Sequence, residues 1–423
     1  MKKLAFLAMV AFPPDAGHAQ PPPGAEARGA GAGFGGLSVL VSNCDDPDRD
    51  ATAALQAATQ QAADTGRPLM ISGKCKVDGT IIITHAPSGN LTIEAVGLGE
   101  IVTNSQDLFK VTPATGTPRI KLVFDNLIVT NRGIRNKGTF LTVNCIAYRQ
   151  FCLVPSQVRN ITANDIGTLL KTYGVNGMVV ADNTLIRYTI DPTVTAPFID
   201  LEGGTSAVST SCNSGIFIEN NQVHGGTFTL LNGCSQGIRW RDNNLLLGYF
   251  GVQQTNPWGV EAMQMQQNYF EAWAGGIRLL SSAFDQITGN SFDRGTIDPS
   301  PNYNAIALGT GNLALPNEMI EGNTVFGMQG ARLGTPFYFN VGNASVVANN
   351  AVNGLIAPVS GNCMMVGTNN SGDKNPSSVI ATLSVTGNVC WAAGVISPIG
   401  KGFVARGNFY TNRAGANTSF EQN

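Results

Sequence analysis

The stretch CNSGIFIENNQV, residues 212–223, shows the pattern that decides the fold of this chain. A short alternation of apolar residues ends in asparagine, and another apolar run follows at once. The same unit recurs at VFDNLIV, QVRNITA, MVVADNTLI, IRWRDNNLL, MQMQQNYF, QITGNSF, EMIEGNTVF, VVANNAV, LSVTGNVC and FVARGNFY. Its asparagines are Asn126, Asn160, Asn183, Asn221, Asn244, Asn268, Asn290, Asn323, Asn350, Asn388 and Asn408.

The intervals between these asparagines predict a coil that repeats. The short intervals cluster near 22–24 residues, and the longer ones fit the same unit with a loop inserted. Strand-like content at a fixed period is typical of a solenoid, whose coils must stack because no coil buries its own apolar face. We expect each asparagine to adopt the left-handed turn conformation. We also expect its amide to hydrogen-bond to the amide one coil away, forming a ladder.

The composition agrees with an all-β chain that has many turns. The 423 residues include 50 glycines, and only 13% are charged. The 26 basic and 28 acidic residues nearly cancel, which argues against a nucleic-acid partner because such a surface needs a basic stripe. Apart from the N-terminal apolar run, which is too short to span a bilayer, no segment suggests a membrane partner.

The chain divides into three expected parts. Residues 1–19 begin MKKLAFLAMVAF and read either as a secretory signal that ends at Gly17-His18-Ala19 or as an N-terminal anchor. Residues 20–42 form a Pro/Gly-rich arm, and residues 43–423 form the solenoid domain. Within that domain, residues 50–66 predict a helix capped by Asp50 and Gly66, placed to cover the open end of the solenoid.

The eight cysteines test the coil spacing. Cys212 and Cys234 are about one coil apart, as are Cys363 and Cys390. Stacked strands lie about 4.8 Å apart, within the Cα separation that a disulfide accepts. We therefore predict the bridges Cys212–Cys234, Cys363–Cys390, Cys145–Cys152 and Cys44–Cys75, the alternative being buried free thiols. Disulfides would indicate an oxidising, extracellular location.

The stretch DDPDRDATAALQAATQQAADTGRPLMISGKCKVDGTIIIT, residues 45–84, resembles the opening of right-handed parallel β-helix proteins of the pectin-lyase-like superfamily. That superfamily includes phage tailspikes and secreted polysaccharide-degrading enzymes. The resemblance covers these residues by pattern and the rest of the chain by coil period alone. It implies a single-stranded right-handed parallel β-helix and, more loosely, a polysaccharide partner.

Counting from the asparagines suggests where acid–base chemistry could lie. Three residues onward, Asn221 gives His224, Asn268 gives Glu271 and Asn290 gives Asp293. Glu271 and Asp293 should be neighbours on adjacent coils, and two carboxyl groups at that spacing suit a retaining glycosidase. Two further carboxylate pairs are Asp285 with Glu318 and Asp200 with Glu202. The alternative is that all these carboxylates are ordinary solvated surface.

Aromatic and basic residues gather near the same pair. Aromatic side chains stack on sugar rings, and arginine binds acidic sugars, so residues 240–295 are the expected groove. The aromatic candidates are Tyr249, Phe250, Trp258, Tyr269, Phe270 and Trp273, and the basic ones are Arg239, Arg241, Arg278 and Arg294. We expect substrate contacts from Trp258, Tyr269, Trp273, Arg278, Arg294 and His224. Core filling is the alternative for each aromatic residue.

Other familiar motifs are absent from the sequence. HGG at 224–226 and GGIRLL at 275–280 match the catalytic set of polygalacturonases poorly. The three histidines have no metal-binding spacing, and no glycine-rich phosphate loop is present, so we expect no metal and no cofactor.

The sequence therefore favours an extracellular β-helix protein that recognises and cleaves a polysaccharide. The arm favours a phage tailspike, a homotrimer that binds phage tail proteins through its N-terminus. A secreted bacterial hydrolase or lyase and a non-catalytic adhesin or structural spike are the alternatives.

Overall fold

A computed structural model describes residues 38–422 apart from short internal gaps. The gaps are 42–43, 45, 47, 105–106, 134–136, 147–151, 188–194, 205–211, 257–258, 296–302, 310–314, 328–330, 342–343, 356–358, 360–361, 369–382, 392–395, 401–402 and 412–416. The expected signal or anchor at 1–19 and most of the arm lie outside the described residues. Val39–Leu40, at the end of the expected arm, instead forms strand β1 and pairs with β2.

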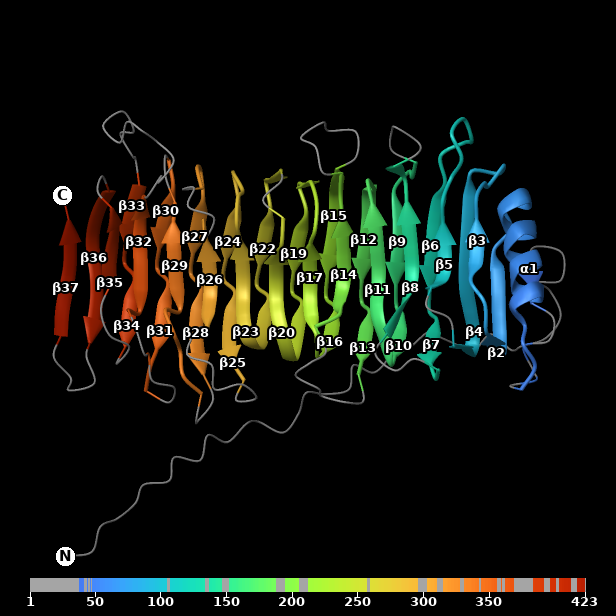
Figure 1. Cartoon of the computed structure of the whole chain (residues 1–423), viewed down its shortest axis with the longest axis horizontal. Helices are drawn as coiled ribbons and strands as arrows, with labels where there is room; N and C mark the ends of the chain where they lie inside the picture. Colours follow the sequence, from blue (N-terminus) through green and yellow to red (C-terminus); the bar gives the residue numbers. More distant parts are fainter. Residues whose placement is uncertain are drawn as a thin grey trace, which may run out of the picture. The chain divides into compact units, whose positions relative to one another are not determined.

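The described chain winds into stacked coils with three strand faces, which we call A, B and C (Figure 1). Face A precedes the asparagine corner, face B follows it, and face C closes the coil. Every pairing within the described residues is parallel, except that β36 pairs with β37 (Asn417–Gln422) in antiparallel fashion. This is the parallel β-helix that the sequence predicts.

The strands of each face follow one another in chain order. Face A holds β1, β2 (Leu69–Val77), β4 (Asn90–Thr103), β6 (Lys121–Asp125), β9 (Ser156–Arg159), β12 (Asn176–Ala181), β15 (Asn213–Glu219), β18 (Ser235–Gln236), β19 (Arg239–Arg241), β21 (Val260–Glu261), β22 (Gln264–Gln266), β24 (Gln286–Thr288), β27 (Met319–Glu321), β30 (Val346–Ala348), β33 (Leu383–Thr386) and β36 (Phe403–Thr411). Face B holds the second parts of β2 and β4, then β7 (Ile128–Asn131), β10 (Thr162–Asn164), β13 (Thr184–Ile186), β16 (Gln222–His224), β20 (Asn244–Gln254), β23 (Tyr269–Leu279), β25 (Ser291–Arg294), β28 (Thr324–Gly327), β31 (Ala351–Asn353), β34 (Val389–Trp391) and the end of β36. Face C holds β3 (Ile81–Ile83), β5 (Asp107–Val111), β8 (Lys137–Asn144), β11 (Ile166–Tyr173), β14 (Pro197–Glu202), β17 (Thr227–Leu231), the second parts of β20 and β23, β26 (Asn304–Leu308), β29 (Phe337–Asn340), β32 (Met364–Thr368) and β35 (Ile396–Gly400).

The asparagine ladder is present and runs from Asn183 to Asn408. Each ladder amide before the last, Asn408, donates to the amide oxygen one coil further on, as Asn268 Nδ2 does to Asn290 Oδ1 at 2.9 Å. Each also donates to a backbone carbonyl of the preceding coil, and all the ladder side chains are buried. The ladder residues are Asn183, Asn221, Asn243, Asn268, Asn290, Asn323, Asn350, Asn388 and Asn408.

Three details of the predicted ladder are wrong. The left-handed residue is the one before the ladder asparagine, for example Asp182 (φ 58°) before Asn183. Asn126 and Asn160 occupy that turn position themselves (φ 55° and 53°), so the buried apolar Leu127 and Ile161 follow where the ladder would be. Third, the ladder residue between Asn221 and Asn268 is Asn243 and not the predicted Asn244.

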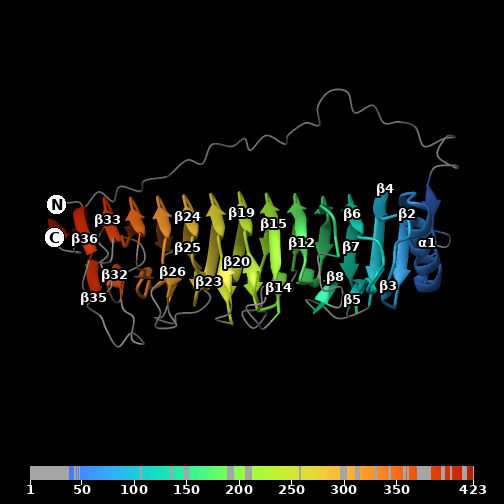
Figure 2. The same cartoon turned by 90° about the horizontal axis from the view of Figure 1, so that it is seen from above.

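Helix α1 (Thr52–Thr65) covers the first coil, as the sequence predicts (Figure 2). Leu55, Ala58 and Ala62 are buried against the solenoid end. Gly66 ends the helix in the left-handed conformation, and its N–H donates to Ala62 O at 2.8 Å. The residue before the helix is Ala51 and makes no side-chain cap, whereas Asp50 Oδ1 accepts from Thr52 N at 2.9 Å. Asp50 therefore caps the start of the helix as expected, although the helix begins two residues later than predicted, at Thr52.

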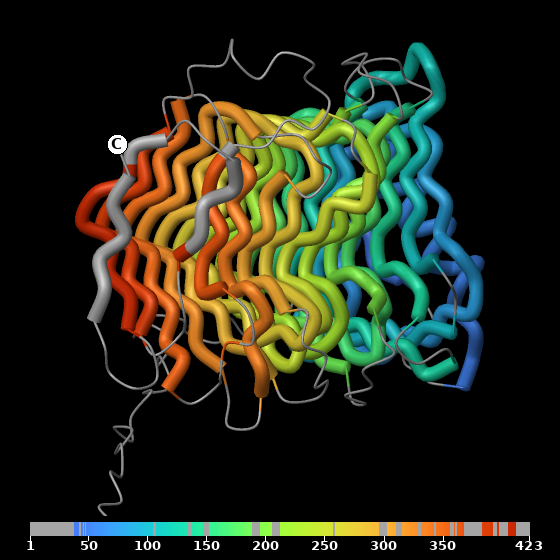
Figure 3. Tube along the Cα trace, turned by 60° about the vertical axis from the view of Figure 1, so that its left-hand side comes forward, coloured from blue at the N-terminus to red at the C-terminus, as the bar shows by residue number. Residues whose placement is uncertain are grey.

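All four predicted disulfides are present. Cys212–Cys234 and Cys363–Cys390 join neighbouring coils, with Cα–Cα distances of 4.6 and 6.1 Å. Cys145–Cys152 closes a local loop, and Cys44–Cys75 ties the segment before α1 to β2. No free cysteine remains among the described residues. The coil spacing inferred from the sequence therefore agrees with the geometry of the stack (Figure 3).

Candidate functional site

Face B places one outward side chain per coil at the third position after the ladder corner, and we call this line the outer row. Strand alternation sends Phe270 and Phe292 into the core and their neighbours outward. Register pairs join Glu271 with Asp293, Asp293 with Phe326, and Asn353 with Trp391. The outer row consists of His224, Leu246, Glu271, Asp293, Phe326, Asn353 and Trp391.

The prediction that Glu271 and Asp293 are neighbours is confirmed by this register. Each residue is only 6% exposed. Glu271 Oε1 and Asp293 Oδ1 are buried without a hydrogen-bond partner among the described residues. An unpaired buried carboxyl oxygen is costly and is uncommon in a merely structural setting. The pair is therefore not the ordinary solvated surface that the sequence left as the alternative.

The surroundings of the two carboxyl groups differ. Burial raises the pKa of Glu271, and a hydrogen bond from the Leu247 backbone N–H opposes that rise. Burial and the Glu271 charge raise the pKa of Asp293 to about 6, although a hydrogen bond from Tyr269 counteracts them. The Tyr269 hydroxyl lies 3.5 Å from Asp293 Oδ2. Asp293 thus holds a proton more readily than an ordinary aspartic acid does, and Glu271 has a backbone donor for its ionised form.

A backbone distortion holds the donor next to Glu271. Leu247 has φ 52°, a conformation that a bulky L-residue rarely adopts. It lies where the register of β20 against β23 shifts between Leu245 and Gly248. Bulges and strained residues gather at functional sites, where they aim particular groups. Here the distortion aims a peptide N–H at a carboxylate.

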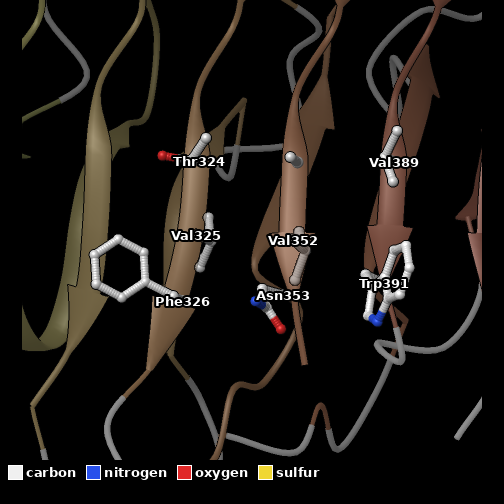
Figure 4. Close-up of a pocket in the computed structure, with 8 residues that line it drawn as sticks. Thr324, Val325, Phe326, Val352, Asn353, Val389 and Trp391 are labelled. Atoms are coloured by element: carbon white, nitrogen blue, oxygen red, sulfur yellow. The ribbon is translucent and has the colours of Figure 1, made fainter. Parts of the chain in front are cut away.

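An apolar groove adjoins the acid pair on the C-terminal side (Figure 4). It has a volume of about 530 Å³ and lies across β28, β31 and β34. Phe326 and Trp391, which are 37% and 53% exposed, flank Asn353 along it. The Phe326 ring also contacts the Tyr269 ring, with centroids 6.4 Å apart. The groove is therefore continuous with the side chains that surround Asp293.

This groove was not predicted from the sequence, although its residues follow the same spacing from the ladder corner as Glu271 and Asp293. Counting three residues from Asn323, Asn350 and Asn388 gives Phe326, Asn353 and Trp391. None of the three is titratable, so acid–base chemistry gave no signal for them.

The other expected substrate-binding residues scatter. His224 lies in the outer row but two coils before Glu271, with Leu246 between them. Trp273 packs against Tyr249, with ring centroids 4.6 Å apart, beyond the acid pair along β23. Arg278 is exposed on face C, where it pairs in register with Gln253 and Ala307. Trp258 lies outside the described residues.

The prediction that Arg294 contacts the substrate is wrong. It is fully buried, and its guanidinium lies 5.4 Å from the ring centroid of Tyr303. The alternation that turns Phe292 inward also turns Arg294 inward, so this side chain offers no surface contact to a substrate.

The other two predicted carboxylate pairs lie elsewhere in the solenoid. Asp200 and Glu202 both bind Lys171 Nζ at 3.0 Å, so they form an ion-pair cluster on face C. Asp285 and Glu318 are buried in adjacent coils. The pKa of each is raised, chiefly by burial. Asp285 accepts from Met263 N and Ser282 Oγ, which favours its ionised form, so Glu318 keeps the shared proton and can donate to Asp285.

Replacing Glu318 by glutamine should make stability less dependent on pH. Glu318 binds its proton more tightly in the folded chain than in the unfolded chain. Its contribution to the free energy of unfolding is therefore fully present below about pH 4.5 and is lost as the pH rises. We expect Glu318→Gln to match the wild type at pH 4.5 and to exceed it by about 1.4 kcal/mol for each pH unit above that, several kcal/mol at pH 8.5. Urea unfolding at both pH values measures this, with Glu94→Gln as the control. Equal pH dependence in both proteins would contradict the proton-sharing pair.

Neither a helix able to cross a membrane nor a cluster of three metal-ligating side chains occurs in the described part of the chain. No protein-family model matches the sequence, and no curated protein does.

Solved structures do resemble the chain. The Arthrobacter chlorophenolicus A6 DFA-IIIase without its lid matches with a TM-score of 0.55 and 14% identity, over 82% of this chain and 94% of that one. The tailspike protein of Acinetobacter phage vB_ApiP_P1 matches with a TM-score of 0.53 and 11% identity, over 86% of this chain and 60% of that one. The Streptococcus pneumoniae surface adhesin PfbA gives 0.49 and 12%, over 89% and 98%. At these identities the two matches with TM-scores above 0.5 show the parallel β-helix fold and nothing finer.

Proposed function

We propose that this protein is an extracellular polysaccharide-cleaving β-helix protein that works as a retaining glycoside hydrolase. The single observation that carries the proposal is the stacked Glu271–Asp293 pair, with unequal surroundings and an aromatic groove beside it. Neighbouring strands lie about 4.8 Å apart, close to the roughly 5–5.5 Å between the carboxyl groups of retaining enzymes. The four disulfides support an extracellular location.

The two residues take different roles in the proposed reaction. Asp293 holds a proton and gives it to the glycosidic oxygen as the bond to the anomeric carbon breaks. Glu271, whose ionised form accepts a hydrogen bond from the Leu247 N–H, attacks that carbon and forms a glycosyl ester. Water then gives its proton to Asp293 and displaces Glu271, which restores both groups.

A polysaccharide panel tests the function directly. Neutral and acidic polysaccharides are incubated with the protein, and reducing ends are measured together with ultraviolet absorbance. We expect reducing ends without unsaturated products. Unsaturated products would identify a lyase, and binding without any product would identify an adhesin.

The pH profile should report Asp293. Turnover needs its proton, so kcat/KM should fall as the pH rises above about 6. Tyr269→Phe removes the hydroxyl that favours the ionised carboxylate, which makes ionisation harder and moves this alkaline limb to higher pH. Tyr249→Phe, which alters a tyrosine that packs on Trp273, serves as the matched control. A limb that stays in place or moves to lower pH would exclude Asp293 as the acid.

The biological setting remains part of the proposal. The likeness to the tailspike of the Acinetobacter phage supports a phage origin through fold alone. The proposal of a homotrimer that binds phage tail proteins rests on the N-terminal arm in the sequence. A secreted bacterial enzyme is the alternative. A non-catalytic glycan binder is the second candidate function, and the deep burial of both carboxyl groups favours it.

A further inference from the structure

The groove beside the acid pair repeats along the solenoid. Thr324 pairs with Ala351, and Ala351 with Val389, so Phe326, Asn353 and Trp391 belong to three successive coils. Successive coils are about 4.8 Å apart, which places the two aromatic residues roughly 10 Å apart along the axis with an amide between them. A glycan chain advances by about the spacing of one coil for each sugar ring. A chain laid along the axis would therefore meet one outer-row residue per ring.

The lining chemistry excludes a charged ligand. None of the described residues that line the groove carries a charge, and its exposed surface is almost wholly apolar. Burying the carboxylate of an acidic sugar here would leave it unpaired, which is costly. A neutral sugar presents C–H faces to aromatic rings and hydroxyl groups to an amide. Asn353 Oδ1 accepts from Leu355 N at 3.0 Å, so the amide N–H groups are the donors that face a ligand.

The groove also begins one coil beyond Asp293. Asp293 pairs with Phe326, and the Tyr269 ring, which contacts Phe326, carries the hydroxyl beside Asp293. A ligand seated on Phe326 would thus place its next ring toward the two carboxyl groups.

We propose that the groove of Phe326, Asn353 and Trp391 binds a neutral polysaccharide running parallel to the solenoid axis, with one sugar ring per coil on the C-terminal side of the cleavage point. This inference rests on the proposed function and deepens it. It replaces the acidic sugar expected from the arginines, because Arg278 lies on face C and Arg294 is buried.

Affinity electrophoresis with an inactive protein tests the inference separately from turnover. The Glu271→Gln protein is run through gels that contain dextran, levan or β-mannan as neutral probes, and alginate or polygalacturonate as anionic probes. We expect at least one neutral polymer to retard it. Trp391→Ala and Phe326→Ala, each added to Glu271→Gln, should weaken that binding about tenfold, and Trp391→Phe should restore most of it.

Phe284→Ala is the matched control, because Phe284 is an exposed aromatic residue at 60% exposure outside the groove. Circular dichroism and the thermal midpoint show that each variant folds. Retardation by anionic polymers only, by none of the five, or equally in all variants would overturn the inference. Self-association that Trp391→Ala abolishes would also overturn it, since the groove would then hold a second copy of the chain.

The two proposals can fail independently. Retardation that depends on Trp391, combined with no release of reducing ends by the wild type, would leave the groove and remove the hydrolase. Cleavage by the wild type that Trp391→Ala and Phe326→Ala do not change would leave the hydrolase and remove the groove.

Discussion

Glu271→Gln and Asp293→Asn should each lower kcat on a cleaved polysaccharide by about a thousandfold or more. Loss of a general acid alone costs roughly 10²–10⁴-fold, and loss of a nucleophile prevents the covalent step. The amides keep the volume of the acids, and a glutamine oxygen can still accept from the Leu247 N–H. The fold should therefore survive, because neither change opens a cavity.

Reducing-end release measures this loss, and circular dichroism monitors the fold. Glu261→Gln, which alters an exposed carboxylate on face A, is the control and should retain full activity. Either amide variant that keeps more than a tenth of the wild-type rate would remove its residue from the mechanism. Asp293→Asn should recover on substrates with a good leaving group, which need no proton, whereas Glu271→Gln should not.

The second large effect concerns the ladder, where two adjacent asparagines should behave oppositely. Asn243 Nδ2 donates to Ile218 O and Asn268 Oδ1 at 2.8 Å each, and its Oδ1 accepts from the backbone and side chain of Asn221. Asn243→Ala leaves several of these buried groups unpaired. At about 1–3 kcal/mol for each unsatisfied group, we expect a loss of roughly 3–5 kcal/mol.

Asn244→Ala is the matched control. The Asn244 side chain lies on the outward side of β20, and its Oδ1 has no partner among the described residues. Its removal should change stability by less than about 0.5 kcal/mol. The thermal or urea midpoints of the two variants measure the difference. Equal midpoints would mean that the ladder contributes little to holding the coils together.

Asn243 and Asn244 also show which features of the fold could be predicted from the sequence. The period of apolar runs and asparagines was enough for the parallel β-helix, because stacking is the way such coils bury their cores. The disulfides followed from the same period. The sequence DNN, however, offers two asparagines for one position, and only the register between coils shows that Asn243 is the buried one.

The candidate site was predictable to the same extent. Counting from the corner found Glu271 and Asp293, because the corner and the strand after it have constant length in those coils. Counting failed for Arg278, since β23 passes from face B to face C and no sequence signal marked that bend. Strand alternation predicts that Arg294 points into the core and that Trp391 points outward, but alternation needs the exact start of each strand, which the sequence alone does not mark.

The most direct test of the stacked acid pair is the stereochemistry of the first product. Proton NMR during early turnover, before the anomers equilibrate, shows which anomer leaves the enzyme. Two carboxyl groups one strand spacing apart predict retention of configuration. Inversion would require a water between groups much further apart, and would contradict the assignment of Glu271 and Asp293 as nucleophile and acid.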